Sequence, residues 1–527
     1  MIIDSRFDTF DLESVDVCII GGGAAGITIA LEMASRRAGR IIVLESGGWD
    51  YDRLTQGRLY GDVVGDRNLP FYRSCYSGLG GSTELWAGWC RPLDQLDFEY
   101  RDWVENSGWP FSRSELDPYY LRANEWCGMG RFGYDVTDWA SRFIGPSLAD
   151  GNELIEHVFQ VKRIRFREVY RERLEATSKV SVILHATTLR LNAASEGNRV
   201  DSAQVLLGNG KQRNLFAKRF VLATGGLENP RLLLLSGGSP SRAIGNQWDL
   251  VGRYFTEHGF VDSGWFIASK QARDLKRYFA IPHPHDSNHA SVRPVLTLCP
   301  ATMADEKLLN AAFYFYPGYE SGVAFGRSGV KSALELLNIW KRRALPGNWF
   351  NLISSSMAAT PFVFWAVVRK AFVSNRPRRK WRLRCYYECA PNPSNRVRLG
   401  DRLDDLRRPI ARLEWAIGEK DLASVRRFHE ITDNNLRSRG LGMLSHLRAL
   451  EEWRRKSETA KHPMGTTRMH ESPRLGVVDR NCKVHGVSNL YISGSSVFPA
   501  TGYANPTLTI LALAVRLADH LGRDATP

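Results

Sequence analysis

A glycine-rich turn followed by an acid is the first group of residues in this sequence that could do chemistry. GGGAAG at Gly21–Gly26 fits the GxGxxG pattern, and Glu45 stands 19 residues after Gly26. In such a turn Gly21 allows the tight bend, Gly23 lets a pyrophosphate approach the backbone, and Gly26 lets helix and strand pack closely. The acid at this spacing binds a ribose hydroxyl. The predicted chemistry is binding of an adenine dinucleotide.

The elements around this turn are those that a dinucleotide site needs. Val15–Ile20 is a short apolar run rich in β-branched residues, which predicts a buried parallel strand. Residues 27–37, ITIALEMASRR, predict an amphipathic helix that ends near Gly39, and Arg40–Leu44 predicts a second strand. The helix N-terminus would face the phosphate charge. This βαβ context distinguishes the segment from a plain glycine turn.

Two further strand-to-loop junctions lie far along the chain. Arg219–Gly238 reads as a buried strand, a turn and a helix, and Asn489–Leu521 reads as a strand, a polar loop and an apolar helix. We therefore predict an α/β fold with a discontinuous dinucleotide-binding domain and an inserted second domain. The predicted boundaries are 1–100, 176–260 and 461–527 for the first domain, and 101–175 and 261–460 for the second.

The composition is that of a packed globular protein. The chain has 527 residues, 43% hydrophobic and 24% charged, which excludes wholesale disorder, collagen and coiled coil. The net charge of +15 favours anionic surroundings without specifying a fold. Eight cysteines without a CxxC pair argue against a disulfide scaffold. The acidic N-terminus lacks the features of a signal or transit peptide, so we expect a cytoplasmic protein.

Four segments together resemble one known family. They are GGGAAG with Glu45, GLGGSTELWAG at Gly78–Gly88, ATGGLENPRLLLLSGG at Ala223–Gly238, and the C-terminal block from HPMGTTRM to ANPTLT. This set resembles the glucose-methanol-choline (GMC) flavoprotein oxidoreductases, and most closely their carbohydrate-oxidising, pyranose oxidase-like branch. The resemblance implies FAD as the cofactor, an FAD-binding Rossmann-like domain and an α+β substrate domain built on an antiparallel sheet.

The last block carries the residues to which the resemblance gives catalytic roles. His462 stands in an HxxGT setting and Asn505 follows 43 residues later. By resemblance His462 takes the hydroxyl proton of the substrate while a hydride passes to flavin N5, and histidine is also the side chain best matched to proton transfer near neutral pH. Asn505 would hold the substrate oxygen. We also expect Asn505 to cap a helix with Pro506 as its first residue, so that the helix dipole faces the flavin.

The resemblance also implies a set of cofactor-binding residues. The expected residues are Gly21, Gly23, Ala24, Ala25, Gly26, Glu45, Ser46, Gly81, Ser82, Trp86, Ala87, Gly88, Leu189, Ala223, Gly225, Gly494, Ser495, Asn505, Pro506 and Thr507. Leu85 stands where relatives with covalently attached flavin carry a histidine, so we expect non-covalent FAD. Ser493–Ser495 replaces the usual acid after the last strand, so backbone and hydroxyl groups would contact the ribityl chain.

Other histidines have simpler interpretations. His470 and His485 lie in the C-terminal block but match no catalytic position, and we interpret them as structural. His283, His285 and His289 form the cluster HPHDSNH, which could be read as a set of metal ligands. No companion cysteine or HExxH motif accompanies them, and neighbouring prolines indicate a loop, so we expect no metal site.

An uncharged stretch, Ala344–Val368, raises the question of membrane contact. Its clean apolar core, FVFWAVV, has only seven residues, far below the roughly 20 that a membrane span needs. We interpret the stretch as part of the substrate domain. An interfacial helix is the alternative, supported by the basic run Arg376–Arg384, and would give weak contact with anionic membrane surfaces. No recognition fold accompanies the basic run, so we expect no nucleic-acid partner.

The sequence thus predicts an FAD-dependent oxidoreductase that oxidises an alcohol to a carbonyl, with a sugar or glycoside as the expected substrate. The alternatives are a non-sugar alcohol dehydrogenase that passes electrons to a quinone or protein, and a non-redox lyase that retains FAD. A nicotinamide enzyme, which would be colourless, is a further class. The electron acceptor is not specified by the sequence and is oxygen, a quinone or a protein.

Overall fold

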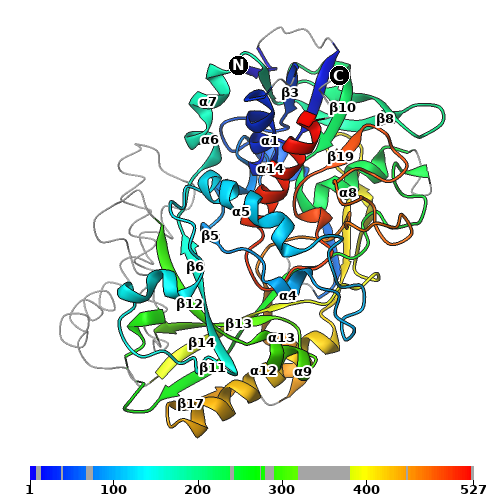
Figure 1. Cartoon of the computed structure of the whole chain (residues 1–527). Helices are drawn as coiled ribbons and strands as arrows, with labels where there is room; N and C mark the ends of the chain where they lie inside the picture. Colours follow the sequence, from blue (N-terminus) through cyan, green and yellow to red (C-terminus); the bar gives the residue numbers. More distant parts are fainter. Residues whose placement is uncertain are drawn as a thin grey trace, which may run out of the picture.

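A computed structural model gives the fold of the chain. It describes residues 1–7, 14–36, 39–66, 75–237, 242–272, 274–278, 290–317, 380–446 and 449–523. Figure 1 shows the two termini at the same end of the molecule, beside the first of two large sheets.

The first sheet has eight strands, and its centre is parallel. The order is β1-β7-β3-β2-β10-β9-β8, with β19 also paired to β10; β1, β7, β3, β2, β10 and β19 run parallel, while β9 and β8 continue the sheet in antiparallel fashion. The bounds are β1 Ile2–Asp4, β2 Val15–Ile20, β3 Ile41–Leu44, β7 Val180–Leu184, β8 Thr187–Ala193, β9 Val200–Leu206, β10 Gln212–Leu222 and β19 Leu490–Ile492. The predicted strand at Val15–Ile20 therefore occurs with its predicted bounds.

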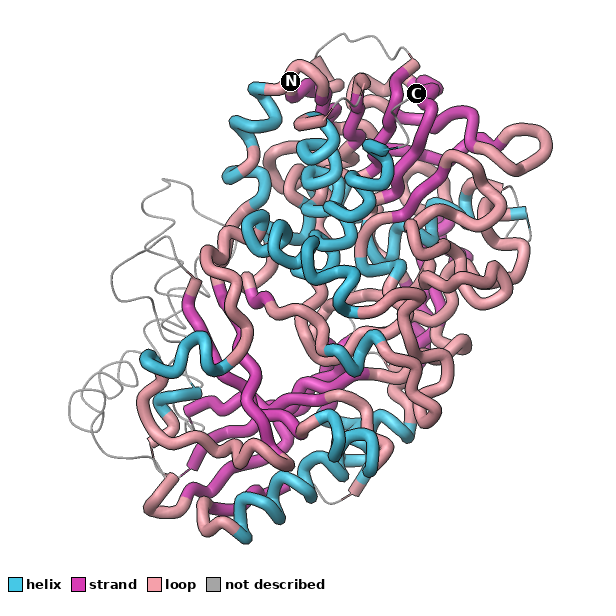
Figure 2. Tube along the Cα trace, viewed as in Figure 1, coloured by secondary structure: helices cyan, strands magenta, loops and turns pink. Residues whose placement is uncertain are grey.

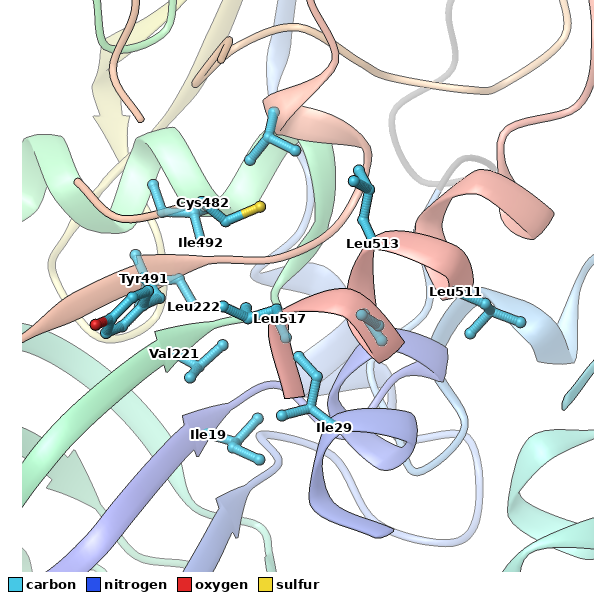
Figure 3. Packing of buried hydrophobic residues seen from close by; sticks show 14 of the residues in the cluster. Ile19, Ile29, Val221, Leu222, Cys482, Tyr491, Ile492, Leu511, Leu513 and Leu517 are labelled. Carbon is cyan, nitrogen blue, oxygen red and sulfur yellow. The ribbon is translucent and has the colours of Figure 1, made fainter. Parts of the chain in front are cut away.

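Two helices from opposite ends of the chain cover the parallel strands. α1, Ala24–Ala34, follows the glycine turn, and α14, Thr507–Arg523, closes the described chain. Ile29 of α1 and Leu517 of α14 pack with Ile19 of β2 and Val221 of β10 in one buried cluster (Figure 3). Fully buried strands of this kind need apolar residues on both faces. This packing positions the glycine turn at the carboxyl end of β2.

The second sheet also has eight strands, in the order β17-β11-β14-β13-β12-β6-β5 with β18 paired to β11, and every pairing is antiparallel. Figure 2 shows this sheet beside the helix-covered first sheet, with α12, Glu419–Ser438, on its far side. The bounds are β5 Trp89–Cys90, β6 Leu154–Val161, β11 His258–Ala268, β12 Ser291–Leu298, β13 Ala311–Pro317, β14 Lys380–Glu388, β17 Gly442–His446 and β18 Ser457–Thr459.

A third, small sheet joins distant parts of the chain. β4, Asp62–Gly65, pairs in parallel with β16, Pro409–Trp415, which pairs with β15, Arg396–Leu403. The fold is α/β with a Rossmann-type nucleotide-binding part, as predicted. The proposed domain boundaries stay a prediction, and β5 joins the second sheet although it precedes residue 101.

Several expectations fall outside the described residues, namely those on Ala344–Val368 and on His283, His285 and His289. In the part of the chain that the structure describes, no helix has the length and hydropathy of a membrane span. The end of the basic run, Lys380–Arg384, forms the start of β14 between β11 and β13. That part of the run is an internal strand of the second sheet.

Candidate active site

The turn between β2 and α1 requires glycine at two of its predicted positions. Gly21 has a φ of +113°, and a Cβ there would lie 2.5 Å from the Ala223 carbonyl oxygen. A Cβ on Gly26 would lie 2.0 Å from the carbonyl oxygen of Gly21. Only glycine avoids both clashes. The turn therefore packs against β10 on one side and α1 on the other.

The second glycine-rich segment closes over the first. Gly80 N–H donates to the Gly22 carbonyl at 2.8 Å. Gly81 has a φ of +55°, and a Cβ on it would lie 2.8 Å from Gly23 Cα. The two segments are far apart in the sequence, but their backbones meet with no room for a side chain between them. They form a continuous glycine cradle, Gly21–Gly26 with Gly78–Gly81, of the kind that lets a pyrophosphate approach main-chain N–H groups.

Glu45 lies at the end of β3 beside this cradle. Its Oε2 accepts from Gly22 N–H at 2.8 Å and its Oε1 accepts from Gly47 N–H at 2.9 Å. Burial raises the pKa of this carboxyl, although the backbone N–H donors act in the opposite direction. Glu45 therefore fixes the glycine cradle in addition to lining the site where we expect a ribose.

One cavity of about 540 Å³ brings together most of the predicted cofactor residues. The predicted residues that line it are Gly21, Gly23, Ala24, Ala25, Glu45, Ser46, Gly81, Ser82, Trp86, Ala87, Gly88, Ala223, Gly225, Gly494, Ser495, Asn505, Pro506 and Thr507. His462 lines the same cavity. Residues from the start, middle and end of the chain thus surround one space.

Two of the predicted cofactor residues do not line this cavity. Gly26 lies behind the cradle, against Gly21, in the packing role expected of it. Leu189 is not among the residues that line the cavity, whereas Thr187 and Thr188 of β8 are, so the assignment of Leu189 stays a prediction. The register between β8 and β9 shifts between Thr188 and Arg190. Leu189 thus lies at an irregular point of this strand pairing.

The predicted catalytic pair meets at the cavity wall. Asn505 Nδ2 lies 3.5 Å from His462 Nε2. The backbone N–H of His462 donates to both carboxylate oxygens of Glu257, at 2.7 and 2.6 Å. Burial lowers the pKa of His462 well below its usual value, and the neighbouring His258 and Lys461 lower it further. His462 is therefore neutral near pH 7, which is the form that accepts a proton.

The structure corrects the expected helix cap. Helix α14 begins at Thr507, and Ile510 N–H donates to the Pro506 carbonyl at 2.8 Å. Pro506 thus precedes the helix instead of being its first residue. The Asn505 side chain faces His462 and not the helix N-terminus. The N-terminal end of α14 still borders the cavity through Pro506 and Thr507.

An aromatic wall, of which only Trp86 was predicted from the sequence, lies on the side of the second sheet. Tyr314 and Tyr316 of β13 and Tyr386 of β14 line the cavity, together with Trp86 and Trp89. Burial raises the pKa of Tyr386 to about 12, so its hydroxyl stays protonated at neutral pH. The cavity therefore offers aromatic faces and a phenolic hydroxyl group on the wall formed by the second sheet.

Arginines support this wall from the same sheet. The Arg293 guanidinium lies 4.6 Å from the Tyr316 ring centroid, and it donates to the Phe315 carbonyl at 2.8 Å. Arg384 lies 5.5 Å from the same ring and is paired with Asp262 at 2.8 Å. Cation–π contacts of this kind fix the orientation of a ring. No short motif marks these residues, and only strand pairing brings them together.

Comparison with known proteins shows which family has this arrangement. Residues 391–514 match the family model described as GMC oxidoreductase. Paromamine 6'-oxidase from Streptomyces fradiae is 24% identical over 98% of this chain and 93% of its own length. The C-terminal part of the chain thus carries the GMC oxidoreductase domain, and the chain is similar to GMC oxidoreductases over nearly its whole length. The fructose dehydrogenase large subunit from Gluconobacter japonicus is 22% identical over 97% of this GMC oxidoreductase and 98% of its own length.

Solved structures share the fold of this GMC oxidoreductase. Pyridoxine 4-oxidase from Mesorbium loti has a TM-score of 0.55 and 16% identity, with 96% of this chain and 99% of that chain covered. A formate oxidase from Aspergillus oryzae RIB40 has a TM-score of 0.58 and 17% identity, with 98% and 99% covered. At these identities the likeness supports the common fold.

The site fits FAD, the cofactor that membership of this family implies. The glycine cradle leaves room for a pyrophosphate at Gly23, where a Cβ would make only an ordinary 3.7 Å contact with Gly81 Cα. Glu45, Thr187 and Thr188 provide oxygens on the same side of the cavity. The chain is therefore an FAD-dependent oxidoreductase that acts on alcohol groups.

Three further residues of the C-terminal part of this GMC oxidoreductase, His470, His485 and Ser495, have partners within the protein. His470 Nδ1 accepts from Ser472 N–H at 2.9 Å, and His485 Nε2 lies 2.9 Å from the His470 carbonyl. Neither histidine lines the cavity, consistent with a structural role. Ser495 Oγ donates to the Pro463 carbonyl at 2.7 Å, so this hydroxyl fixes the residue after His462.

The lowered pKa of His462 predicts an unusual pH profile for this GMC oxidoreductase. The base is active only when neutral, and its neutral form is present above its pKa. An ordinary histidine would lose half of that form near pH 6.5, as an approximate value. We therefore expect the rate of anaerobic flavin reduction to be retained through this pH and to fall only in more acidic buffer. Stopped-flow reduction across a pH series measures this, and a loss of half the rate at or above the ordinary value would contradict it.

Proposed function

We propose that this GMC oxidoreductase oxidises an alcohol of a sugar or glycoside to a carbonyl, with His462 as the base. The observation that carries the proposal is the pairing of His462 Nε2 with Asn505 Nδ2, 3.5 Å apart, on a cavity that runs from the glycine cradle to the tyrosine wall. Bound FAD supplies the hydride acceptor. The residues of the chain must bind the substrate, orient its C–H bond and remove the hydroxyl proton.

Each residue of the pair has one task in this reaction. The lone pair of His462 Nε2 accepts the hydroxyl proton as the hydride leaves the same carbon. The Asn505 amide N–H donates to the substrate oxygen and orients the C–H bond, and it cannot compete for the proton. The Glu257 side chain accepts hydrogen bonds from the backbone N–H of His462, and these bonds fix the position from which the imidazole extends. One proton and one hydride leave the alcohol, which becomes a carbonyl.

The tyrosine wall supports a carbohydrate as the substrate. A pyranose ring has a face of C–H groups, which packs on aromatic rings, and a rim of hydroxyl groups, which bonds to phenols. Tyr314, Tyr316 and Tyr386 provide both kinds of contact on one side of the cavity. Two aligned relatives are named paromamine 6'-oxidase and 6'''-hydroxyparomomycin C oxidase. These names support an alcohol on a sugar-like ring.

A panel of alcohols tests the proposed substrate class. We expect sugars and glycosides to reduce the flavin faster than aliphatic alcohols under anaerobic conditions, because only the ring substrates use the tyrosine wall. Tyr316→Ala should slow the sugars more than a small aliphatic alcohol, whereas Trp248→Ala, at an exposed position outside the cavity, should slow neither. Equal losses for both alcohols in the Tyr316 variant would contradict a carbohydrate substrate.

We also propose that the FAD is held without a covalent bond. Leu85 follows η1, Gly81–Glu84, and lines the cavity at the position where covalently flavinylated relatives would need a histidine. Leucine has no nucleophilic atom. After acid precipitation of the purified enzyme, the yellow colour should stay in the supernatant. Colour that remains with the pelleted protein after washing would contradict this proposal.

A further inference from the structure

The imidazole of His462 lies against a second buried histidine to which we have assigned no role. His258 begins β11 and is 1% exposed. Its Nδ1 lies 3.3 Å from Nδ1 of His462, and the two rings meet at 81° with centroids 5.4 Å apart. The two residues are 204 positions apart in the chain. The contact uses the ring nitrogen of His462 that does not face Asn505.

The other nitrogen of His258 determines which of these atoms carry protons. Its Nε2 lies 3.2 Å from the Thr501 carbonyl oxygen, which can only accept a hydrogen bond. Burial lowers the pKa of His258 to about 4, so the ring is neutral and has one N–H. That N–H must be on Nε2 to satisfy the carbonyl. Nδ1 of His258 is then an acceptor, and it requires an N–H on Nδ1 of His462.

We propose that His258 is a positioning residue that fixes the tautomer of His462, holding the proton on Nδ1 and the lone pair on Nε2. The chain of hydrogen bonds runs from His462 Nδ1–H to His258 Nδ1, and from His258 Nε2–H to the Thr501 carbonyl. This proposal rests on the proposed function in one respect, namely that His462 is the base. The lone pair on Nε2 then points to the cavity, where the hydroxyl proton must be accepted.

The surroundings keep this chain of bonds in place. Glu257 Oε1 accepts from the backbone N–H of His258 at 3.0 Å, and the same carboxylate accepts from His462 N–H. Glu388, which lies opposite His258 in β14, is paired with Arg101 at 2.5 Å, so its charge is compensated. Besides burial, the titratable groups that lower the pKa of His462 are His258 and the exposed Lys461. When Nε2 accepts the substrate proton, Nδ1–H keeps its acceptor on His258, and no second proton moves.

Two substitutions of His258 distinguish its role as a hydrogen-bond acceptor from the packing of its ring. His258→Leu fills most of the space but offers no acceptor, whereas Oδ1 of His258→Asn can accept from His462 Nδ1–H. We expect anaerobic flavin reduction in the leucine variant to slow by about 10- to 100-fold, the usual cost of losing a partner that orients a histidine. The KM and the flavin content should change little. The asparagine variant should recover most of the lost rate.

A matched control removes a buried imidazole elsewhere. His429 packs between Phe313 and Trp453, with centroid distances of 4.4 and 4.8 Å, and lies outside the cavity. His429→Leu should keep the rate of flavin reduction of the wild type. Equal rates in the leucine and asparagine variants at position 258, whether slow or unchanged, would overturn the proposal, because the acceptor would then have no role.

A spectroscopic measurement tests the tautomer without any substrate. In the holoenzyme labelled with ¹⁵N-histidine, the resonances that disappear in His462→Gln identify the ring of His462. We expect a protonated Nδ1 and a bare Nε2 for His462, and the opposite pattern for His258. A proton on Nε2 of His462 would overturn the inference even if both variants at position 258 fail to fold. If no alcohol reduces the wild-type flavin, the proposed function fails, and this spectrum still decides the tautomer.

Discussion

His462→Ala should purify with a normal content of FAD and be reduced by its best alcohol about a hundred- to ten-thousand-fold more slowly than the wild type, the usual cost of removing a general base. The variant loses only the proton acceptor. The glycine cradle, formed by Gly21–Gly26 with Gly78–Gly81, does not use the His462 side chain. Flavin content and flavin reduction should therefore separate. Anaerobic stopped-flow reduction of the loaded variant measures the loss.

Two controls make this result specific. Asn505→Ala should lose less rate than His462→Ala, since the substrate is less well oriented while the base remains 3.5 Å away in the wild-type geometry. His470→Ala removes a histidine of the same C-terminal block that lies outside the cavity, and should keep the wild-type rate. Reduction of His462→Ala at nearly the wild-type rate would show that another group is the base.

Gly23→Val should fold normally and lose its FAD. Gly23 has φ −80° and ψ −173°, which is extended backbone that any residue adopts, and a Cβ would lie 3.7 Å from Gly81 Cα. The valine methyl groups, however, would fill the space into which the pyrophosphate must come. We expect FAD to bind at least about tenfold more weakly, a loss of ~1.4 kcal/mol. Titration of the apoprotein with FAD measures the affinity.

Gly26 provides the contrasting case for this prediction. A Cβ there would lie 2.0 Å from the Gly21 carbonyl oxygen, so Gly26→Ala should destabilise the fold even without FAD. Thermal unfolding of the two apoproteins should therefore show a lowered midpoint for Gly26→Ala and an unchanged midpoint for Gly23→Val. A Gly23→Val protein that remains fully loaded with FAD would show that the pyrophosphate does not approach this residue.

Some parts of the fold could be predicted from the sequence, because short segments alone determine them. The run Val15–Ile20 forms a buried strand with the predicted bounds, because all of its residues except Asp16 are apolar, as a strand buried on both faces requires. Gly21 and Gly26 have the steric roles that their spacing predicts. The pairing of His462 with Asn505 was implied by the family resemblance, which rests there on a motif and a fixed interval. In each case the signal lies within one segment or in the spacing of two.

The features that were missed or wrongly predicted depend on tertiary structure. His258 reaches His462 only because β11 and β18 pair, and no motif marks it. The tyrosine wall depends on strand pairing in the second sheet. Asn505 resembles a helix cap by composition, but its side chain is turned toward His462, where the site needs an amide.

In the proposed reaction this chain oxidises an alcohol, a hydride passes to bound FAD and His462 is the base. Anaerobic mixing of the purified yellow enzyme with a panel of sugars, glycosides and aliphatic alcohols tests it most directly. We expect that at least one sugar or glycoside bleaches the flavin, that the colour returns when a suitable electron acceptor is added, and that His462→Ala bleaches far more slowly. A loaded enzyme that keeps its colour with every alcohol, while dithionite bleaches it, would contradict the account and favour a protein that retains FAD without redox chemistry.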